Sequence, residues 1–216
     1  MPKIVDRDAR RREIVETYLR VVARDGMEAA STRALAAELG VSSGALWHYF
    51  DGFDEVLFRA FQLIFERTNV RIAASTEAKE GVGALLAMLE ELHPLDKVTR
   101  DEAYVVTSFW GRVPSKPSLG VFQSRVEERW RADIRDHLAD GVRLGELDPA
   151  IPFDGVADTL LVLVVGYQVE HVLRTPVAAP ERQWRAVDQV LTPWLTELGR
   201  ASSGLDRREA ASDLTG

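Results

Sequence analysis

Apolar residues recur along this chain at intervals of three and four positions, the spacing of one face of an α-helix. Sustained alternation with a period of two, which marks a half-buried strand, is nearly absent. Serine, threonine, aspartate, proline and glycine at the ends of the apolar runs suit helix caps and breaks. The pattern predicts an all-α fold of about nine helices, near residues 6–26, 31–40, 42–50, 54–65, 83–94, 98–111, 117–145, 152–174 and 181–198.

The last two of these helices differ in pattern. Residues 152–174 are apolar almost all round, so we expect this helix to be buried on every side. Its longest apolar stretch, Leu160–Tyr167, is shorter than the about 20 residues of a membrane span, so we expect no membrane association. Residues 181–198 carry an apolar stripe on one side. Either the two helices pack against their own copies as a four-helix dimer interface, or they fill the core of a single chain.

The composition is that of a globular protein of one or two domains, with 216 residues and 46 % apolar residues. The chain has no cysteine, which excludes disulfides and thiolate metal sites and fits a reducing cytosol. Its charged N-terminus lacks the apolar region of a secretory signal, so we expect a cytoplasmic protein. Residues 201–216 are poor in large apolar side chains, which predicts a disordered tail.

The charge is unevenly distributed. Residues 1–50 hold eight Lys/Arg and seven Asp/Glu, which is a net charge of +1. The whole chain has a net charge of −7, so the remaining residues carry −8. This balance argues against a protein that coats nucleic acid non-specifically. A local basic face remains possible around the run Arg10, Arg11 and Arg12, because the net charge averages such a face away.

The segment "LAAELGVSSGALWHYF", residues 35–50, has the features that a helix-turn-helix requires. Ala36 is small where the helices cross, and Gly40 at the turn tolerates a left-handed backbone. The positions expected to face inward are Leu35, Leu39, Val41, Leu46 and Tyr49. The positions expected to face outward are Ser42, Ser43, Gly44, Ala45 and His48. Small residues there let the backbone approach a groove of DNA closely. A purely structural helix pair is the alternative.

These residues carry a resemblance to a known family. Residues 10–61 resemble the N-terminal domain of TetR-type transcriptional regulators, in the run just described, the preceding "ARDGMEAAST" and the helix after "FDGFDEVL". The later stretch "RLGELDPAIPFDGVADTLLVLVVGYQVEHVL" is similar to the choline-pathway-repressor-like branch. The resemblance implies an all-α homodimer with a DNA-binding domain over 1–53 and a ligand-binding and dimerisation domain over 54–200. It further implies a repressor that a small molecule releases from a palindromic operator in double-stranded DNA.

The resemblance also implies roles for individual residues. Base or sugar contacts are expected from Ser42, Ser43, Gly44, Ala45 and His48. Phosphate contacts are expected from Thr32, Arg33, Trp47 and Tyr49. Arg33 is equally well explained as a solvated surface charge, and Tyr49 as a mainly core residue.

Two positions depart from the family pattern. Trp47 stands where tyrosine is usual and Phe53 where lysine is usual. Since Phe53 cannot replace a cation, we expect either phosphate contacts shifted toward Arg10–Arg12 or a low affinity for DNA. The alternative function is therefore a helical interaction or sensor protein that binds DNA weakly or not at all.

The second half of the chain offers candidates for an effector pocket, because such sites combine aromatic walls with a few polar groups. The candidates are Tyr104, Phe109, Trp110, Phe122, Trp130, Tyr167, Gln168 and His171, each of which is otherwise an ordinary core residue. The sequence does not identify the effector.

We expect no enzyme, no cofactor and no metal. Glu90-x-x-His93 has the spacing of a di-iron ligand pair but no second copy, and His93 fits a cation at a helix C-terminus better. Asp133 and His137 fit a surface ion pair better than a metal site. No phosphate-binding loop or nucleophile elbow occurs.

Overall fold

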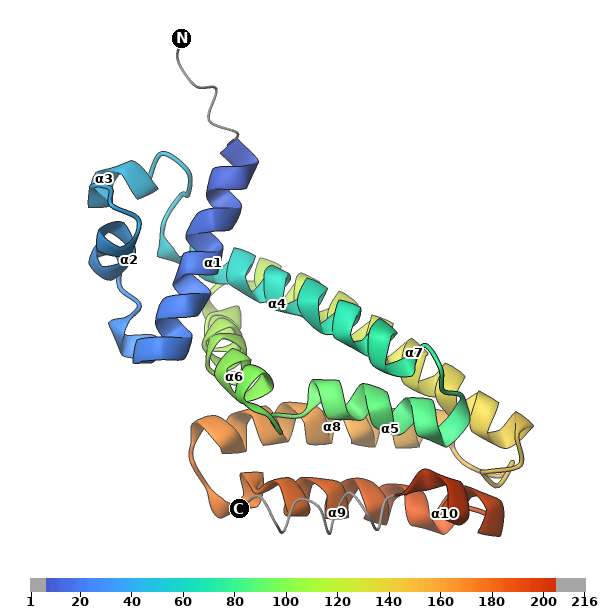
Figure 1. The fold of residues 1–216 in the computed structure, drawn as a ribbon. Coiled ribbons are helices and arrows are strands. Elements are labelled where there is room, and N and C mark those ends of the chain that lie inside the picture. Colours follow the sequence, from blue (N-terminus) through green and yellow to red (C-terminus); the bar gives the residue numbers. More distant parts are fainter. Residues whose placement is uncertain (1–6, 205–216) are drawn as a thin grey trace.

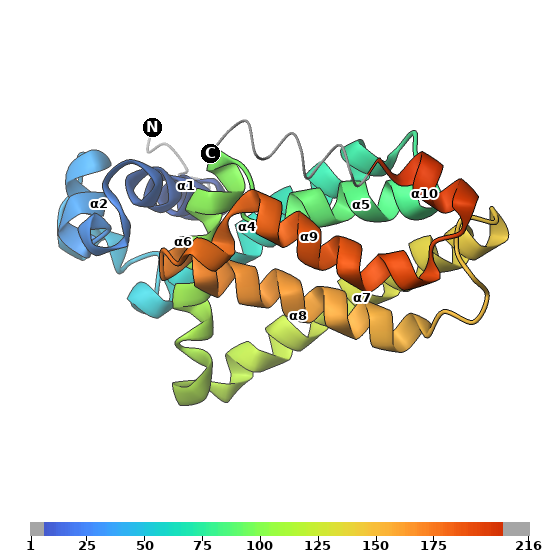
Figure 2. The ribbon, with the colours of Figure 1, turned by 90° about the horizontal axis from the view of Figure 1, so that it is seen from below.

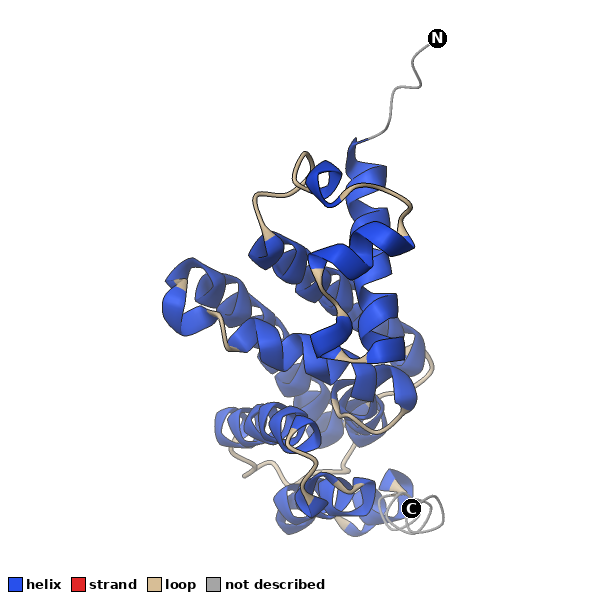
Figure 3. Cartoon of the chain, turned by 90° about the vertical axis from the view of Figure 1, so that its left-hand side faces the viewer, coloured by secondary structure: helices blue, strands red, loops and turns tan. Residues whose placement is uncertain are grey.

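The computed structural model describes residues 7–204, and this part of the chain is almost entirely helical (Figures 1 and 3). The predicted all-α fold is thus confirmed. The α-helices are α1 (Arg7–Asp25), α2 (Thr32–Glu38), α3 (Ser43–Leu46), α4 (Phe53–Thr76), α5 (Gly81–Leu92), α6 (Lys97–Trp110), α7 (Pro117–Arg143), α8 (Phe153–Val172), α9 (Pro180–Leu191) and α10 (Glu197–Ser203). Short 3-10 turns lie at Met27–Ala29, Val113–Ser115, Pro176–Ala178 and Thr192–Trp194.

The three N-terminal helices form one end of the molecule, and α4 runs from them along the body (Figure 1). Helix α5 packs against both α4 and α7, and α6 packs against α1, α4 and α8. Helices α8 and α9 lie side by side at the face opposite α1, as the view from below shows (Figure 2). The long α4 and the bridging α6 thus connect the N-terminal helices to the rest of the fold.

The interior consists of two apolar clusters. The first joins α1, α2, α3 and α4, and it also takes in Val105 and Phe109 of α6 and Val126 of α7. The second joins α5, α7, α8 and α9 around fully buried residues such as Leu85, Met88 and Leu138. Because the first cluster includes α6 and α7, the N-terminal helices are packed firmly against the second half of the chain.

The predicted helix over 181–198 is divided in the structure. It is interrupted by the turn Thr192–Trp194, and Leu195 beyond the turn forms an isolated bridge with Leu147. The physical reason is Pro193, which has no backbone N–H to continue the helix. Helix α10 then begins at Glu197, and it is capped by Thr196, whose hydroxyl accepts a hydrogen bond from Gly199 N at 3.1 Å.

This capped helix extends through Ser203, so the first three residues of the predicted disordered tail are helical. Residues 205–216 lie outside the described residues.

Helix α8 does not match the prediction of burial on every side, because one stripe of it is exposed in the single chain. The exposed positions recur every three or four residues: Gly155, Thr159, Val162, Gly166, Val169 and Leu173. Length and composition alone would allow α8 to cross a bilayer, and only 28 % of its apolar window is buried. An apolar helix of this kind in a folded domain requires a cover for its open side.

Candidate nucleic-acid interface and effector cavity

The predicted helix-turn-helix is present in α2, α3 and the turn between them. Ser31 caps α2 by accepting from Ala34 N at 3.3 Å, and Ser42 caps α3 by accepting from Ala45 N at 3.3 Å. Gly40 in the turn has a φ of +65°, the left-handed conformation that glycine adopts without penalty. A serine thus caps each of the two helices, and the prediction of a left-handed glycine at the turn is confirmed.

The inner and outer faces of this unit also follow the predicted pattern. Leu35, Ala36 and Leu46 are buried, and Leu39, Val41 and Tyr49 pack against the same core while partly exposed. The candidate DNA-contacting residues that are exposed are Arg33, Ser42, Ser43, Gly44, Trp47 and His48. Thr32, Ala45 and Tyr49 are half-buried. The exposed face of α3 is thus lined by small and polar groups.

Arg11 fixes the end of α3 in place. Its Nε donates to the carbonyl oxygen of Tyr49 at 2.7 Å, and its Nη2 donates to Glu55 at 3.0 Å. Its guanidinium also lies over the Phe50 ring, 5.4 Å from the centroid. Glu55 in turn accepts from Asp51 N at 2.8 Å. Arg11 therefore positions the outer helix instead of standing free for DNA.

Its neighbours in the basic run are also engaged. Arg10 pairs with Glu13 at 2.5 Å, and Arg12 pairs with Glu16 at 3.4 Å. Arg33, by contrast, is exposed and forms no ion pair within residues 7–204. Arg7 likewise forms no ion pair among the described residues, and its Nη2 donates to the carbonyl oxygen of His48 at 3.4 Å, so both arginines are available to a phosphate near α3.

Phe53 has a structural explanation. It is half-buried, and its ring meets the Tyr18 ring edge-on with centroids 5.6 Å apart. The position that is lysine in the family pattern here adds an aromatic contact between α1 and α4.

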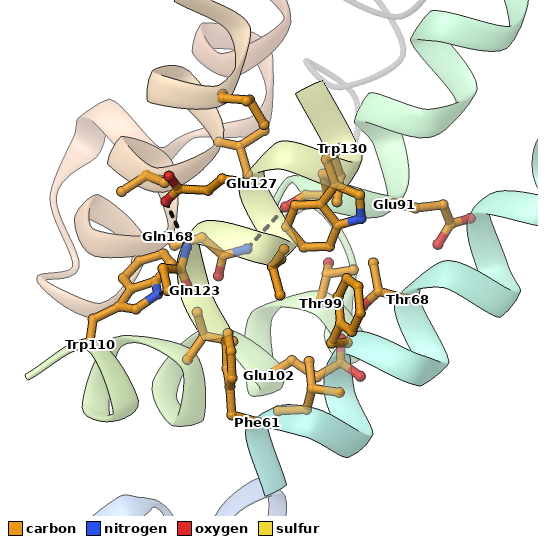
Figure 4. Close-up of a pocket in the computed structure, with 18 residues that line it drawn as sticks. Phe61, Thr68, Glu91, Thr99, Glu102, Trp110, Gln123, Glu127, Trp130 and Gln168 are labelled. Atoms are coloured by element: carbon orange, nitrogen blue, oxygen red, sulfur yellow. Dashed lines mark hydrogen bonds between the residues drawn. The ribbon is translucent and has the colours of Figure 1, made fainter. Parts of the chain in front are cut away.

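A second site lies among α4, α5, α6, α7 and α8, where a partly open cavity of about 50 Å³ is present (Figure 4). An engineered cavity that binds benzene has a volume of about 150 Å³, so this smaller cavity is nearly filled by its own side chains. Its aromatic walls are Phe61, Phe65, Trp110 and Trp130. Its polar lining consists of Thr68, Glu91, Thr99, Glu102, Gln123, Glu127 and Gln168.

Three of the eight residues proposed from sequence line this cavity, namely Trp110, Trp130 and Gln168. Phe109 and Phe122 instead pack into an aromatic cluster with Phe61. The other three are Tyr104, His171 and Tyr167. Tyr104 and His171 contact each other edge-on, and Tyr167 donates to the carbonyl oxygen of Arg182 at 3.3 Å. These five residues do not line the cavity.

Acidic side chains are prominent in the cavity wall. Arg71 bridges two of them, since its Nε donates to Glu91 at 3.0 Å and its Nη2 donates to Glu102 at 2.9 Å. Burial raises the pKa of Glu102, although Arg71 opposes the shift. One guanidinium thus balances two carboxylates.

The third carboxylate, Glu127, is bound differently. The indole N–H of Trp110 donates to Gln123 Oε1 at 2.8 Å, and Gln123 Nε2 donates to Glu127 at 2.7 Å. No Lys, Arg or His of the described chain lies within ion-pair distance of Glu127. Glu127, Leu161 and Val165 also line an outer groove between α7 and α8, so Glu127 stands where the cavity meets the surface.

The segment after Trp110 connects this cavity wall to the N-terminal helices. Lys116 pairs with Asp54 at 2.5 Å, and Arg112 approaches the same carboxylate at 3.6 Å. Lys116 lowers the pKa of Asp54. Asp54 lies in the first turn of α4, next to Glu55, which helps to hold the end of α3. We call these two ion pairs the Asp54 contact.

His93 corrects the sequence interpretation of a charged helix end. Its side chain is buried, its Nδ1 is 2.8 Å from the Leu89 carbonyl oxygen, and burial lowers its pKa to about 4. It is therefore neutral at pH 7. No group of three potential metal ligands occurs in the part of the chain that the structure describes.

Sequence reasoning missed the acidic lining. Three acidic residues of the lining lie on helices beside apolar positions: Glu91, Glu102 and Glu127. An acidic residue that interrupts an apolar helix face is the sequence signal for such a site. Aromatic content alone does not separate lining from core, because both use the same side chains.

The chain matches two known sequence families. Residues 14–60 match bacterial regulatory proteins of the tetR family, and residues 82–214 match the C-terminal domain of BetI-type transcriptional repressors. The transcriptional regulator PksA of Bacillus subtilis is 47 % identical over 72 residues, 33 % of this chain and 35 % of that protein. BetI 1 of Chromohalobacter salexigens is 27 % identical over 134 residues, 60 % of this chain. The chain spans 35 % of PksA and 65 % of BetI 1.

Solved structures share the fold over nearly the whole chain. A transcriptional regulator from Rhodococcus sp. Rha1 superposes with a TM-score of 0.70 at 26 % identity, covering 85 % of this chain and 94 % of its own. A protein from Saccharomonospora viridis, described as a transcriptional regulator and solved in complex with choline, gives a TM-score of 0.77 at 20 % identity, covering 88 % of this chain and 100 % of its own.

Proposed function

The chain belongs to the tetR family of bacterial regulatory proteins, and from this premise we propose a dimeric transcriptional regulator whose DNA binding responds to a small molecule. In this proposal residues 1–53 bind DNA and residues 54–200 bind the effector and dimerise. The observation that carries it is the outward face of α3 and of the turn after it, where Ser43, Gly44 and His48 are exposed on a unit that Arg11 holds from behind. Such a face can enter the major groove of DNA closely.

The proposed contacts follow from exposure and chemistry. Ser42, Ser43, Gly44, Ala45 and His48 approach the bases. Arg33, Thr32, Trp47 and Tyr49 approach the phosphates, and Arg33 supplies the cation that Phe53 does not. Few long donors face the groove, so close fit and DNA shape contribute to specificity.

The exposed stripe of α8 supports dimerisation. Val162, Val169 and Leu173 on this stripe are 70 %, 38 % and 64 % exposed in the single chain. Gly155 and Gly166 on the same stripe allow a second helix to approach closely. The apolar side of α9, with Trp184 and Leu191, packs into the core of the same chain. In the proposed dimer α8 therefore forms the centre of the interface and α9 its edge. Two α3 helices on a two-fold axis would read half-sites about 34–36 Å apart.

The first experiment is to incubate the purified protein with sheared genomic DNA from its source and to sequence the retained fragments. We expect an enriched inverted repeat. Gly44→Glu should abolish retention and leave the fold intact, because Gly44 is exposed and a Cβ added there meets no atom within 4 Å. Gly83→Glu is the matched control, since Gly83 has the same free space but lies on α5. No enrichment by folded wild-type protein would favour the alternative, an interaction protein without DNA binding.

We further propose that the effector is an organic cation that binds in the cavity beside Glu127. Aromatic rings attract cations through their faces, and Glu127 is a carboxylate without a cationic partner at the cavity entrance. The choline bound to the Saccharomonospora viridis protein suggests the first probe. Because the cavity is nearly filled, an effector must displace side chains, and this displacement gives it different affinities for two conformations.

Calorimetric titration with choline tests the class of effector. A unit charge pair 4 Å apart near a protein surface interacts by about 4 kcal/mol before desolvation is subtracted. Glu127→Gln should therefore weaken choline binding about tenfold or more. Glu128→Gln is the control, because Glu128 carries the same charge one residue further along α7 and lies only in the outer groove. Equal losses in both variants would argue against a specific cation site.

A further inference from the structure

Three buried side-chain atoms among the described residues lack a hydrogen-bond partner: His93 Nε2, Gln183 Oε1 and Gln168 Oε1. Of these residues only Gln168 lines the cavity. A buried acceptor without a donor is unfavourable by about 1–3 kcal/mol, so such an atom in a binding site indicates a missing partner.

The orientation of the Gln168 amide is determined by its other end. Gln168 Nε2 donates to the carbonyl oxygen of Leu92 at 3.0 Å, and Figure 4 shows the amide among the lining side chains. Leu92 is the last residue of α5, so its carbonyl has no partner within the helix. Rotating the amide by half a turn would place two oxygens against each other. The Oε1 atom therefore faces away from Leu92.

The neighbouring polar groups do not supply the missing donor. The indole N–H of Trp110 is used by Gln123, and the indole N–H of Trp130 donates to Asn69 at 3.1 Å. The Gln123 amide donates to Glu127. The Thr99 hydroxyl donates to Asp96 at 3.1 Å, and the Thr68 hydroxyl accepts from Arg71 at 3.1 Å. The other polar lining groups are carboxylates, which accept hydrogen bonds when ionised. The cavity thus offers mainly acceptors to a ligand.

We propose that Gln168 determines effector specificity by requiring an O–H or N–H group on the organic cation, which donates to Gln168 Oε1. This inference rests on the proposed cation site. It assigns the ligand two features: a positive charge for Glu127 and the aromatic rings, and a hydrogen-bond donor for Gln168. A cation that carries only alkyl groups leaves Oε1 unpaired and binds more weakly.

Two probes separate these features. Choline and n-propyltrimethylammonium have the same charge and nearly the same shape, and they differ by a hydroxyl in place of a methyl group. Calorimetric titration of the full-length protein should give choline a dissociation constant about 5- to 150-fold lower. Simple apolar transfer predicts the opposite order, because the methyl compound is the more hydrophobic of the two.

Gln168→Leu should reduce the preference for choline to about onefold. Gln168→Met, which is unbranched, serves if the leucine variant is not folded. Gln183→Leu is the matched control, because Gln183 is also buried with an unpartnered Oε1 and its Nε2 donates to the Ala178 carbonyl, but it lies outside the cavity. This control should keep the full preference.

The outcomes are distinguishable. Binding of both probes with equal affinity to the wild-type protein overturns the role of Gln168 and leaves the cation site standing. A preference that persists in both Gln168 variants also overturns it. Failure of both probes to bind the wild-type protein overturns the organic-cation effector and this inference together.

Discussion

Val162 on α8 provides a quantitative test of the proposed dimer. It is 70 % exposed in the single chain, and full burial of a valine side chain contributes about 1.5–3 kcal/mol. Covering the exposed share therefore contributes about 1–2 kcal/mol, and a two-fold interface includes the residue twice. Val162→Asp removes this contribution of about 2–4 kcal/mol, which raises the dimer dissociation constant about 30- to 1,000-fold. Desolvation of the new carboxylates adds to the loss.

The assay is sedimentation velocity over a dilution series, with circular dichroism to confirm folding. Val70→Asp is the matched control, because Val70 on α4 is also 70 % exposed but lies off the stripe. We expect only the Val162 variant to dissociate, and we expect it to lose operator affinity at concentrations where it is monomeric. A Val162→Asp protein that remains as dimeric as the wild type would refute the assignment of this interface.

Two further predictions concern pH and signal transmission. Burial lowers the pKa of His93 from 6.5 to about 4, so the unfolded chain binds a proton at this residue before the folded chain does as the pH falls. The free energy of unfolding should therefore drop by up to about 3 kcal/mol between pH 6.5 and 4. In urea titrations, His93→Leu should remove this part of the pH dependence. Asp54→Asn removes both ion pairs of the Asp54 contact. It should change stability by about 1 kcal/mol or less and leave choline binding intact, yet reduce the effect of choline on operator affinity. Asp101→Asn, which removes the exposed Lys97–Asp101 pair, is the control, and an equal reduction there would exclude a specific role for Asp54.

The helix-turn-helix is predictable from sequence because its requirements are local. Two serine caps, a left-handed glycine and a helical period of apolar residues lie within 20 positions, and each of these features predicts one structural element. The engagement of Arg11 with Tyr49 and Glu55 was not predictable, since it joins residues 38 and 44 positions apart.

The cavity was predictable only in part. Its lining comes from five helices, and no short pattern reports which faces converge. Phe109 and Trp110 are adjacent in sequence, yet the first is core and the second lines the cavity. The open stripe of α8 could not be predicted from the sequence, because a helix face that packs against a partner and one that packs into the core contain the same types of apolar residue.

Helix α4 has a mechanical consequence. It is one uninterrupted helix of 24 residues, about 36 Å long at 1.5 Å per residue. Thr68 and Phe65 touch the cavity in its second half, and its first turn abuts the residues that hold α3. A tilt of about 5° around its far end displaces the first turn by about 3 Å, comparable to the length of a hydrogen bond to a phosphate. If α4 tilts as a rigid body, a side-chain-sized disturbance at the cavity would be amplified to the scale on which DNA contacts form or break.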